Sequence, residues 1–180
     1  MEALEHFQES VSVRGVRWTA LQNLHVTVFF FGDVEERNIP SLKMALSGLC
    51  RSTPVFTLDF EGVTFAPPPR SAGGVSPGRP PRMIWVQFAR SEEFGRFAAH
   101  VFEVAKPFLD LKSVRRLEHD PIPHVTLARF DDPAVAAQIH LEQLQPETVP
   151  VDTAILFASE LRRDGSVYTS LERYALSPAA

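Results

Sequence analysis

Short runs of β-branched and aromatic residues alternate along this chain with stretches in which apolar residues recur at helical spacing. The short runs predict strands, and the one at 24–31 has the composition of a buried strand. A pair of runs also flanks an Asp-Gly dipeptide near the end of the chain, which is typical of a β-hairpin. The predicted strands lie at 16–18, 24–31, 55–65, 82–89, 124–130, 151–161 and 166–176.

Three stretches carry the periodicity of amphipathic helices. The first covers about 35–49 and has Pro40 in its first turn, where proline is tolerated. Ser91 is suited to cap the second, and Asp132 followed by Pro133 predicts the start of the third. Because this order mixes hairpins with crossovers, we expect an α+β fold rather than a doubly wound sheet.

Two segments of the chain resemble each other. His25-Val-Thr-Val-Phe-Phe-Phe-Gly-Asp33 and His124-Val-Thr-Leu-Ala-Arg-Phe-Asp-Asp132 share His, Val, Thr, Phe and Asp at the same offsets. Both have strand composition and both run into a predicted helix through an acidic turn. The repeat suggests two related halves whose strands face each other across a pseudo-two-fold axis.

The spacing within each motif points to phosphoester chemistry. Residues i and i+2 of a strand share a face, so His25 is expected beside Thr27 and His124 beside Thr126. Two histidines can supply the base and the acid that phosphodiester hydrolysis needs near neutral pH. The threonine hydroxyls can donate to the non-bridging phosphate oxygens, and the reaction requires no metal.

Simpler interpretations exist for each histidine. A single His-Val-Thr is most often just part of a strand, but two copies in matching context favour function. A buried neutral histidine can also serve only a hydrogen bond in the core. His119 and His124 are five residues apart, yet no third metal ligand stands at a recognisable spacing. The remaining histidines, His6, His100 and His140, are expected on helices as surface or packing residues.

Composition narrows the class of protein. The 180 residues fit one domain, which could be built as two lobes, and the 44% hydrophobic content can fill a core. A net charge of -4 argues against a broad nucleic-acid-coating surface, but it leaves room for a pocket that grips one phosphate. The Pro- and Gly-rich segment 67–81 is predicted to be a flexible surface loop.

The same reasoning bears on location. One cysteine, Cys50, excludes a disulfide within the chain, so we expect a reducing, cytoplasmic compartment. The acidic N-terminus has no apolar segment typical of a secretory signal. No apolar run approaches the roughly 20 residues that span a bilayer, so no membrane contact is expected.

With these motifs the sequence resembles the RNA 2',3'-cyclic phosphodiesterases, historically called 2'-5' RNA ligases, of the two-histidine (2H) phosphoesterase superfamily. The similarity runs from about residue 16 to residue 174, and the two motif blocks carry most of it. The similar segments are Val16-Arg-Trp18, residues 23–34, Arg82-Met-Ile-Trp85, Pro123-His-Val-Thr-Leu-Ala-Arg129, Leu156-Phe-Ala-Ser159 and Gly165-Ser-Val-Tyr168.

The resemblance implies a bilobal α+β fold, with antiparallel sheets from two pseudo-symmetric halves lining a central cleft. It implies hydrolysis of the 2',3'-cyclic phosphate at RNA 3' ends, or in cyclic nucleotides, to a 2'-phosphate without metal or cofactor. Some members also join tRNA halves reversibly through a 2'-5' linkage. In this picture His25 protonates the departing 3' oxygen and His124 activates water. Separately from the resemblance, we expect a monomer.

Two further residues take roles from the resemblance. Arg129 matches an arginine of the second motif and is expected to bind phosphate, with a structural salt bridge as the alternative. Regular alternation along the strand places Arg129 on the face opposite to that of His124. Arg129 could reach the face of His124 only if a β-bulge or a twist changed the alternation. The resemblance also suggests that Phe30 stacks on the terminal base. Its strand parity is wrong relative to His25, so core packing is the role that the sequence favours for it.

The chain departs from the family pattern in three places. Family members usually begin with an apolar strand, whereas this chain starts at what would be the following helix, so one lobe is expected to lack a strand. The segment 119–123 lacks an expected Phe, and the loop at 67–81 is longer than usual.

The alternative functions are a phosphodiesterase for another cyclic or 2'-5' linked nucleotide, and a catalytically idle RNA-end-binding module.

Overall fold

The computed structural model divides into two compact units, each assembled from three separate stretches of chain. Unit 1 comprises Met1–Val26, Asp59–Ala89 and His124–Glu147. Unit 2 comprises Thr27–Leu58, Arg90–Pro123 and Thr148–Ala180. The structure describes residues 7–9, 11, 13–67, 80–110, 121–141, 147–162 and 165–178. Most of the predicted loop at 67–81, the tip of the predicted hairpin, His6 and His119 fall outside those residues.

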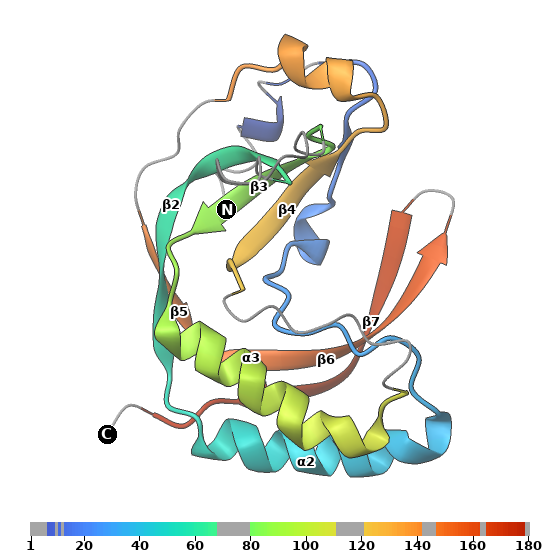
Figure 1. Ribbon diagram of the computed structural model, residues 1–180, viewed down its shortest axis with the longest axis vertical. Coiled ribbons are helices and arrows are strands. Elements are labelled where there is room, and N and C mark those ends of the chain that lie inside the picture. Colours follow the sequence, from blue (N-terminus) through green and yellow to red (C-terminus); the bar gives the residue numbers. More distant parts are fainter. Residues whose placement is uncertain are drawn as a thin grey trace, which may run out of the picture. The chain divides into compact units, whose positions relative to one another are not determined.

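A five-stranded sheet has the order β1-β4-β3-β2-β5, and its central strands lie side by side in Figure 1. Strand β4 pairs antiparallel with both β1 and β3, and β3 pairs antiparallel with β2. The strands are β1 (Arg17–Trp18), β2 (Phe56–Ala66), β3 (Met83–Phe88), β4 (His124–Arg129) and β5 (Thr148–Val151).

Strand β3 shows how the sheet separates a buried face from a more open one. Ile84, Val86 and Phe88 are at most 6% exposed, whereas the alternate residues of β3 are only half-buried. Successive side chains of a strand point to opposite faces, so the apolar residues close the core side of the sheet. The alternate residues of β3 therefore line the face that is available for a site.

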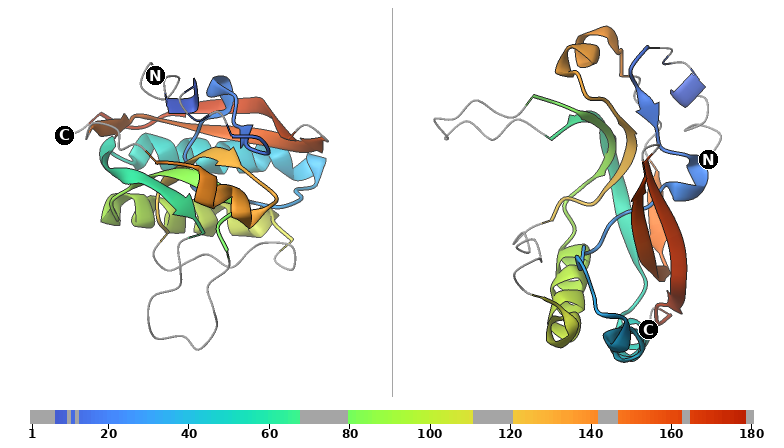
Figure 2. Two further views of the ribbon diagram at one scale, coloured as in Figure 1. Left: turned by 90° about the horizontal axis from the view of Figure 1, so that it is seen from above. Right: turned by 90° about the vertical axis from the view of Figure 1, so that its right-hand side faces the viewer.

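Unit 2 is built on two helices and a hairpin, which Figure 2 shows from two further directions. Helix α2 (Ile39–Ser52) contacts both α3 (Glu92–Ala105) and β7 (Gly165–Ala175), and β7 pairs antiparallel with β6 (Thr153–Arg162). Ser91 caps α3 as predicted, because its side chain accepts a hydrogen bond from the Phe94 amide. Burial of the apolar faces stabilises this unit. Its core contains Leu42, Leu46, Cys50, Phe97, Val101, Ala105, Leu156, Tyr174 and Leu176.

The prediction of a strand at 24–31 is wrong except at one residue. Val26 forms an isolated antiparallel bridge with Val125, and the residues after it form no strand. Unit 2 begins directly after Val26, at Thr27. There Phe29 and Phe31 pack against the hydrophobic core as irregular chain. Their strand-like composition reflects burial, since strand propensity measures packing more than an intrinsic backbone preference.

The third predicted helix, which starts after Asp132, is a short 3₁₀ helix and not an α-helix. Asp132 does cap it, accepting a hydrogen bond from the Ala134 amide, but η4 (Pro133–Gln138) is a 3₁₀ helix of 6 residues. Val135 and Ile139 are both buried. The described residues contain no helix that is both long and apolar enough to cross a membrane.

Candidate active site

The second motif occupies β4, where its histidine and threonine lie on the more open face of the sheet. In the antiparallel register His124 is opposite Gln87 and Thr126 is opposite Trp85. Directly opposed residues of paired strands point to the same face, so these four side chains share one face of unit 1. His124 and Thr126 are both half-buried, which leaves them accessible from that face.

An irregularity in β4 brings Arg129 to the same face. Ile84 pairs with Ala128 and Trp85 pairs with Thr126, so Leu127 is an extra residue without a partner on β3. An extra residue of this kind is a β-bulge, and it reverses the alternation of side chains beyond it. Leu127 and Ala128 are both fully buried, and Arg129 is exposed opposite Met83. The bulge that the sequence parity required for Arg129 is therefore present.

The first motif joins the other edge of β4. Strand β1 pairs with Ala128 and Arg129, the 3₁₀ turn η1 (Leu21–Asn23) follows, and Val26 then bridges Val125. This antiparallel register sets His25 across from Thr126. His25 thus reaches the face that carries His124, and all three residues belong to unit 1.

The turn η1 fixes the tautomer of His25. The imidazole Nδ1 lies 2.7 Å from the carbonyl oxygen of Asn23. A carbonyl oxygen can only accept, so Nδ1 carries the proton and donates it to this bond. Nε2 is then the ring atom that gains and loses a proton, which is the arrangement a general acid or base requires.

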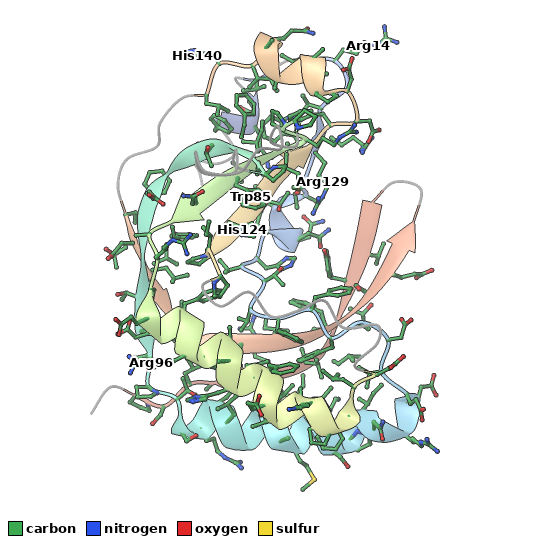
Figure 3. The ribbon with its side chains drawn as sticks, viewed as in Figure 1. Arg14, Trp85, Arg96, His124, Arg129 and His140 are labelled. Atoms are coloured by element: carbon green, nitrogen blue, oxygen red, sulfur yellow. The ribbon has the colours of Figure 1, made fainter. Side chains whose placement is uncertain are left out.

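Trp85 covers one side of the second histidine. The indole and the His124 imidazole are stacked, with ring centroids 3.6 Å apart and planes inclined by 17°. Trp85 is the diagonal neighbour of His124 across the β3–β4 pair, a separation that aromatic side chains can bridge. Figure 3 shows both rings on the face from which Arg129 also projects.

Arg129 is the basic residue of this face that has no carboxylate partner within the described chain. Its Nη1 donates to the Met83 sulfur at 2.9 Å, a weak acceptor. Arg17 lies directly opposite Arg129 on β1 but is engaged with Asp131, at 2.5 and 2.9 Å. That hydrogen-bonded pair raises the pKa of Arg17 and lowers the pKa of Asp131. The described contacts thus do not include the salt bridge considered for Arg129.

The other predicted site residues lie in unit 2. Thr27 is its first residue and is exposed, and the Phe30 side chain is 56% exposed. Core packing is therefore the wrong role for Phe30, whereas its neighbours Phe29 and Phe31 do pack inward. His100 is exposed on α3, as predicted, whereas His140 is exposed but lies beyond the end of η4, so its predicted place on a helix is wrong. Among the described residues no three His, Cys, Asp or Glu side chains gather as a metal site would require.

Sequence reasoning missed the contribution of β3. Met83, Trp85 and Gln87 share the face of His124, and Gln87 donates to the Glu61 carboxylate at 2.6 Å. The signal was the alternation along this strand, in which apolar residues separate these three from one another. Only the register with β4 shows that they lie beside the second motif.

Comparison with known proteins identifies the family. The family model described as the 2'-5' RNA ligase superfamily matches residues 2–163. A Thermus thermophilus protein named RNA 2',3'-cyclic phosphodiesterase is 30% identical over 165 residues, covering 91% of this chain and 77% of that protein. A protein of the same name from Methanothermobacter thermautotrophicus is 25% identical over 169 residues, covering 89% and 83%.

Solved structures agree with the fold. The crystal structure of TT0787 from Thermus thermophilus matches with a TM-score of 0.78 and 26% identity, covering 99% of this chain and 92% of that one. Escherichia coli LigT complexed with ATP matches with a TM-score of 0.63 and 25% identity, covering 98% and 89%. Because the family model covers most of the chain and the relatives and solved structures match over nearly its whole length, this chain belongs to the 2'-5' RNA ligase superfamily.

Proposed function

We propose that this protein hydrolyses the 2',3'-cyclic phosphate at RNA 3' ends and leaves a 2'-phosphate. The observation that carries the proposal is the bridge between Val26 and Val125, which brings His25, Thr126 and His124 to one sheet face. Relatives named RNA 2',3'-cyclic phosphodiesterase cover most of the chain and support the same reaction.

The two histidines divide the proton transfers. His124 accepts a proton from water as the water oxygen forms a bond to phosphorus. The bond between phosphorus and the ribose 3' oxygen breaks, and Nε2 of His25 donates a proton to that leaving oxygen. The bonded Nδ1 of His25 supports this role, because it holds the ring with Nε2 as the exchanging atom.

The remaining motif residues stabilise the charge on phosphate. The hydroxyl of Thr126 can donate to a non-bridging oxygen between the two histidines. Thr27 has in the first motif the place that Thr126 has in the second, so we propose the same role for it. Arg129 reaches this face through the Leu127 bulge, and its guanidinium retains donors that can bind phosphate. Phe30 is proposed to stack on the terminal base, since its ring is exposed.

The proposal is tested with adenosine 2',3'-cyclic phosphate and with an RNA that ends in a cyclic phosphate, both in the presence of EDTA. We expect a 2'-phosphate product from both substrates, and we expect His25→Ala and His124→Ala to abolish it. His100→Ala is the matched control, because that histidine is exposed on α3 in the other unit. Full turnover by His25→Ala, or a 3'-phosphate product, would overturn the mechanism.

The same assay separates the competing functions. Turnover of a 2'-5' linked dinucleotide with none of the cyclic phosphate would indicate another phosphodiesterase. Binding of the RNA end without turnover would indicate a binding module. Joining of RNA halves is assayed separately, with one half ending in the cyclic phosphate and the other in a 5' hydroxyl. We also propose that the protein works as a monomer in the cytoplasm, where the buried thiol of Cys50 would stay reduced.

A further inference from the structure

We propose that Trp85 is a positioning residue for His124, and that its indole face stabilises the imidazolium formed when His124 takes a proton from water. This inference rests on the proposed function, in which His124 is the base. It assigns a role to a side chain that belongs to neither H-V-T motif and that comes from a different strand.

The geometry of the pair carries the proposal. The ring centroids are 3.6 Å apart and the planes are inclined by only 17°, so one whole side of the imidazole rests on the indole. The neutral rings alone would favour an offset or edge-to-face arrangement. A cation above the face of Trp is favourable, because the ring quadrupole places negative charge there. This arrangement therefore suits the charged form of His124.

The stack is held from the β3 side. Ile84 and Val86 flank Trp85 along the strand and are 0% and 6% exposed, which anchors the backbone beneath the indole. The indole Nε1 is buried and has no hydrogen-bond partner among the described residues. Trp85 therefore contacts the site through the face of its indole ring. This contact restricts the rotation of the His124 imidazole.

The charged groups of this sheet face set the electrostatic surroundings of the stack. On this face Arg129 lies on β4, Arg17 on β1 and His25 beside the Val26 bridge. These groups are positive when protonated, and Arg17 and Arg129 oppose a further positive charge, although Asp131 pairs with Arg17. The carboxylates of the face, Asp59 and Glu61, are on β2, which β3 separates from β4.

On β3 itself, the cross-strand neighbours of His124 are the uncharged Gln87 and Trp85. Gln87 is engaged with Glu61. Among these neighbours, the indole is the one in face-to-face contact with the imidazole. We therefore assign to Trp85 the stabilisation of positive charge on His124.

The test compares Trp85→Leu and Trp85→Phe with the wild-type protein. Leucine covers the imidazole without a quadrupole, whereas phenylalanine keeps a weaker one. We expect the His124 pKa, followed by NMR titration of the imidazole carbons, to fall in Trp85→Leu by about 0.4 to 1.5 units. The Trp85→Phe variant should lie between it and the wild type. His124→Ala identifies the resonance.

Kinetics supply the second measurement. Loss of imidazolium stabilisation should lower kcat by about 2- to 30-fold and leave KM near its wild-type value. The acidic limb of the pH profile of kcat/KM should move to lower pH, because the base then loses its proton more readily. Trp18→Leu is the matched control, since among the described residues the aromatic contact of Trp18 is an edge-on one with Phe7. It should leave the His124 pKa and the acidic limb unchanged.

The outcomes are distinguishable. An unmoved His124 pKa in both Trp85 variants overturns the inference even if the enzyme is active. If Trp85→Leu does not fold, the pKa in Trp85→Phe decides the question alone. A wild-type protein without turnover would refute the proposed function, whereas a lowered His124 pKa in the Trp85 variants would still support the stacking role.

Discussion

Val26 and Val125 hold the same position in the two H-V-T motifs, and the structure makes them partners in an antiparallel bridge. An antiparallel pair of equivalent residues has a local two-fold axis between them. Within unit 1 this axis relates the start of the first motif to the second motif, which is why His25 lies across from Thr126. The repeat in the sequence thus has a direct structural counterpart at the candidate site.

Thr126 offers the first prediction. Thr126→Val keeps the shape of the side chain but removes the hydroxyl proposed to donate to phosphate. We expect kcat to fall by about 100- to 1000-fold, the range for loss of one donor to a developing oxyanion. Thr126→Ser should recover most of the rate in the same cyclic phosphate assay. A Thr126→Val enzyme with the wild-type rate would remove this threonine from the mechanism.

Arg129 gives the second prediction. Its guanidinium has only the Met83 sulfur as a described side-chain partner, so its loss should cost activity and not stability. Arg129→Gln is expected to lower kcat/KM for cyclic phosphate substrates, with an unchanged midpoint of urea unfolding. Arg17→Gln is the matched control, because Arg17 is directly opposite on β1 and already paired with Asp131.

The losses of activity in Arg129→Gln and Arg17→Gln, compared with each other, show which arginine binds the reacting phosphate. A larger loss of activity in Arg17→Gln than in Arg129→Gln would place the phosphate contact on β1 instead of β4. Equal and small losses would indicate that neither arginine binds the reacting phosphate.

Phe30 gives the third prediction. Its ring is 56% exposed, so Phe30→Ala should leave the free energy of unfolding nearly unchanged. If the ring stacks on the terminal base, KM for the RNA substrate should rise by about 5- to 150-fold. Phe97→Ala is the stability control, since Phe97 is 2% exposed and its truncation should cost about 3–5 kcal/mol. An unchanged KM in Phe30→Ala would exclude the stacking role.

The sequence predicted much of this molecule because local patterns decide most of its elements. The capping role of Ser91, the hairpin of β6 and β7 and the strand at 124–129 follow from spacing and residue type. The strand predicted for the residues after Val26 is wrong. A run of β-branched and aromatic residues has the same composition whether it pairs in a sheet or packs against a core as irregular chain.

Within the site, the motif residues were predictable and their neighbours were not. His25 and His124 could be recognised because they repeat, and repetition is visible along the chain. Trp85 joins them only through the register of β3 with β4. Arg129 was expected from the family resemblance, but the bulge at Leu127 that brings it to this face is known only from the structure. Register and bulges depend on contacts between distant segments, so no local pattern reveals them.

Tyr174 supports the last prediction, which concerns stability. Its hydroxyl is buried in the core of unit 2 and lacks a hydrogen-bond partner among the described residues. Such a group costs free energy because it has left water without compensation. Tyr174→Phe removes it and should raise the free energy of unfolding by about 1 kcal/mol near neutral pH.

The same tyrosine makes stability depend on pH in the alkaline range. Burial, followed by the charges of Glu172 and Cys50, raises the pKa of Tyr174 from 10.0 to about 12. The unfolded chain therefore releases this proton first, so the folded state loses stability as pH rises from about 10 to about 12. Below about pH 10 the contribution of this group is constant. Tyr174→Phe lacks the linkage, so its stability advantage over the wild type should widen above pH 10, as measured by urea unfolding at a series of pH values. Parallel alkaline losses in the two proteins would show that the Tyr174 hydroxyl titrates in the folded state as it does in the unfolded chain.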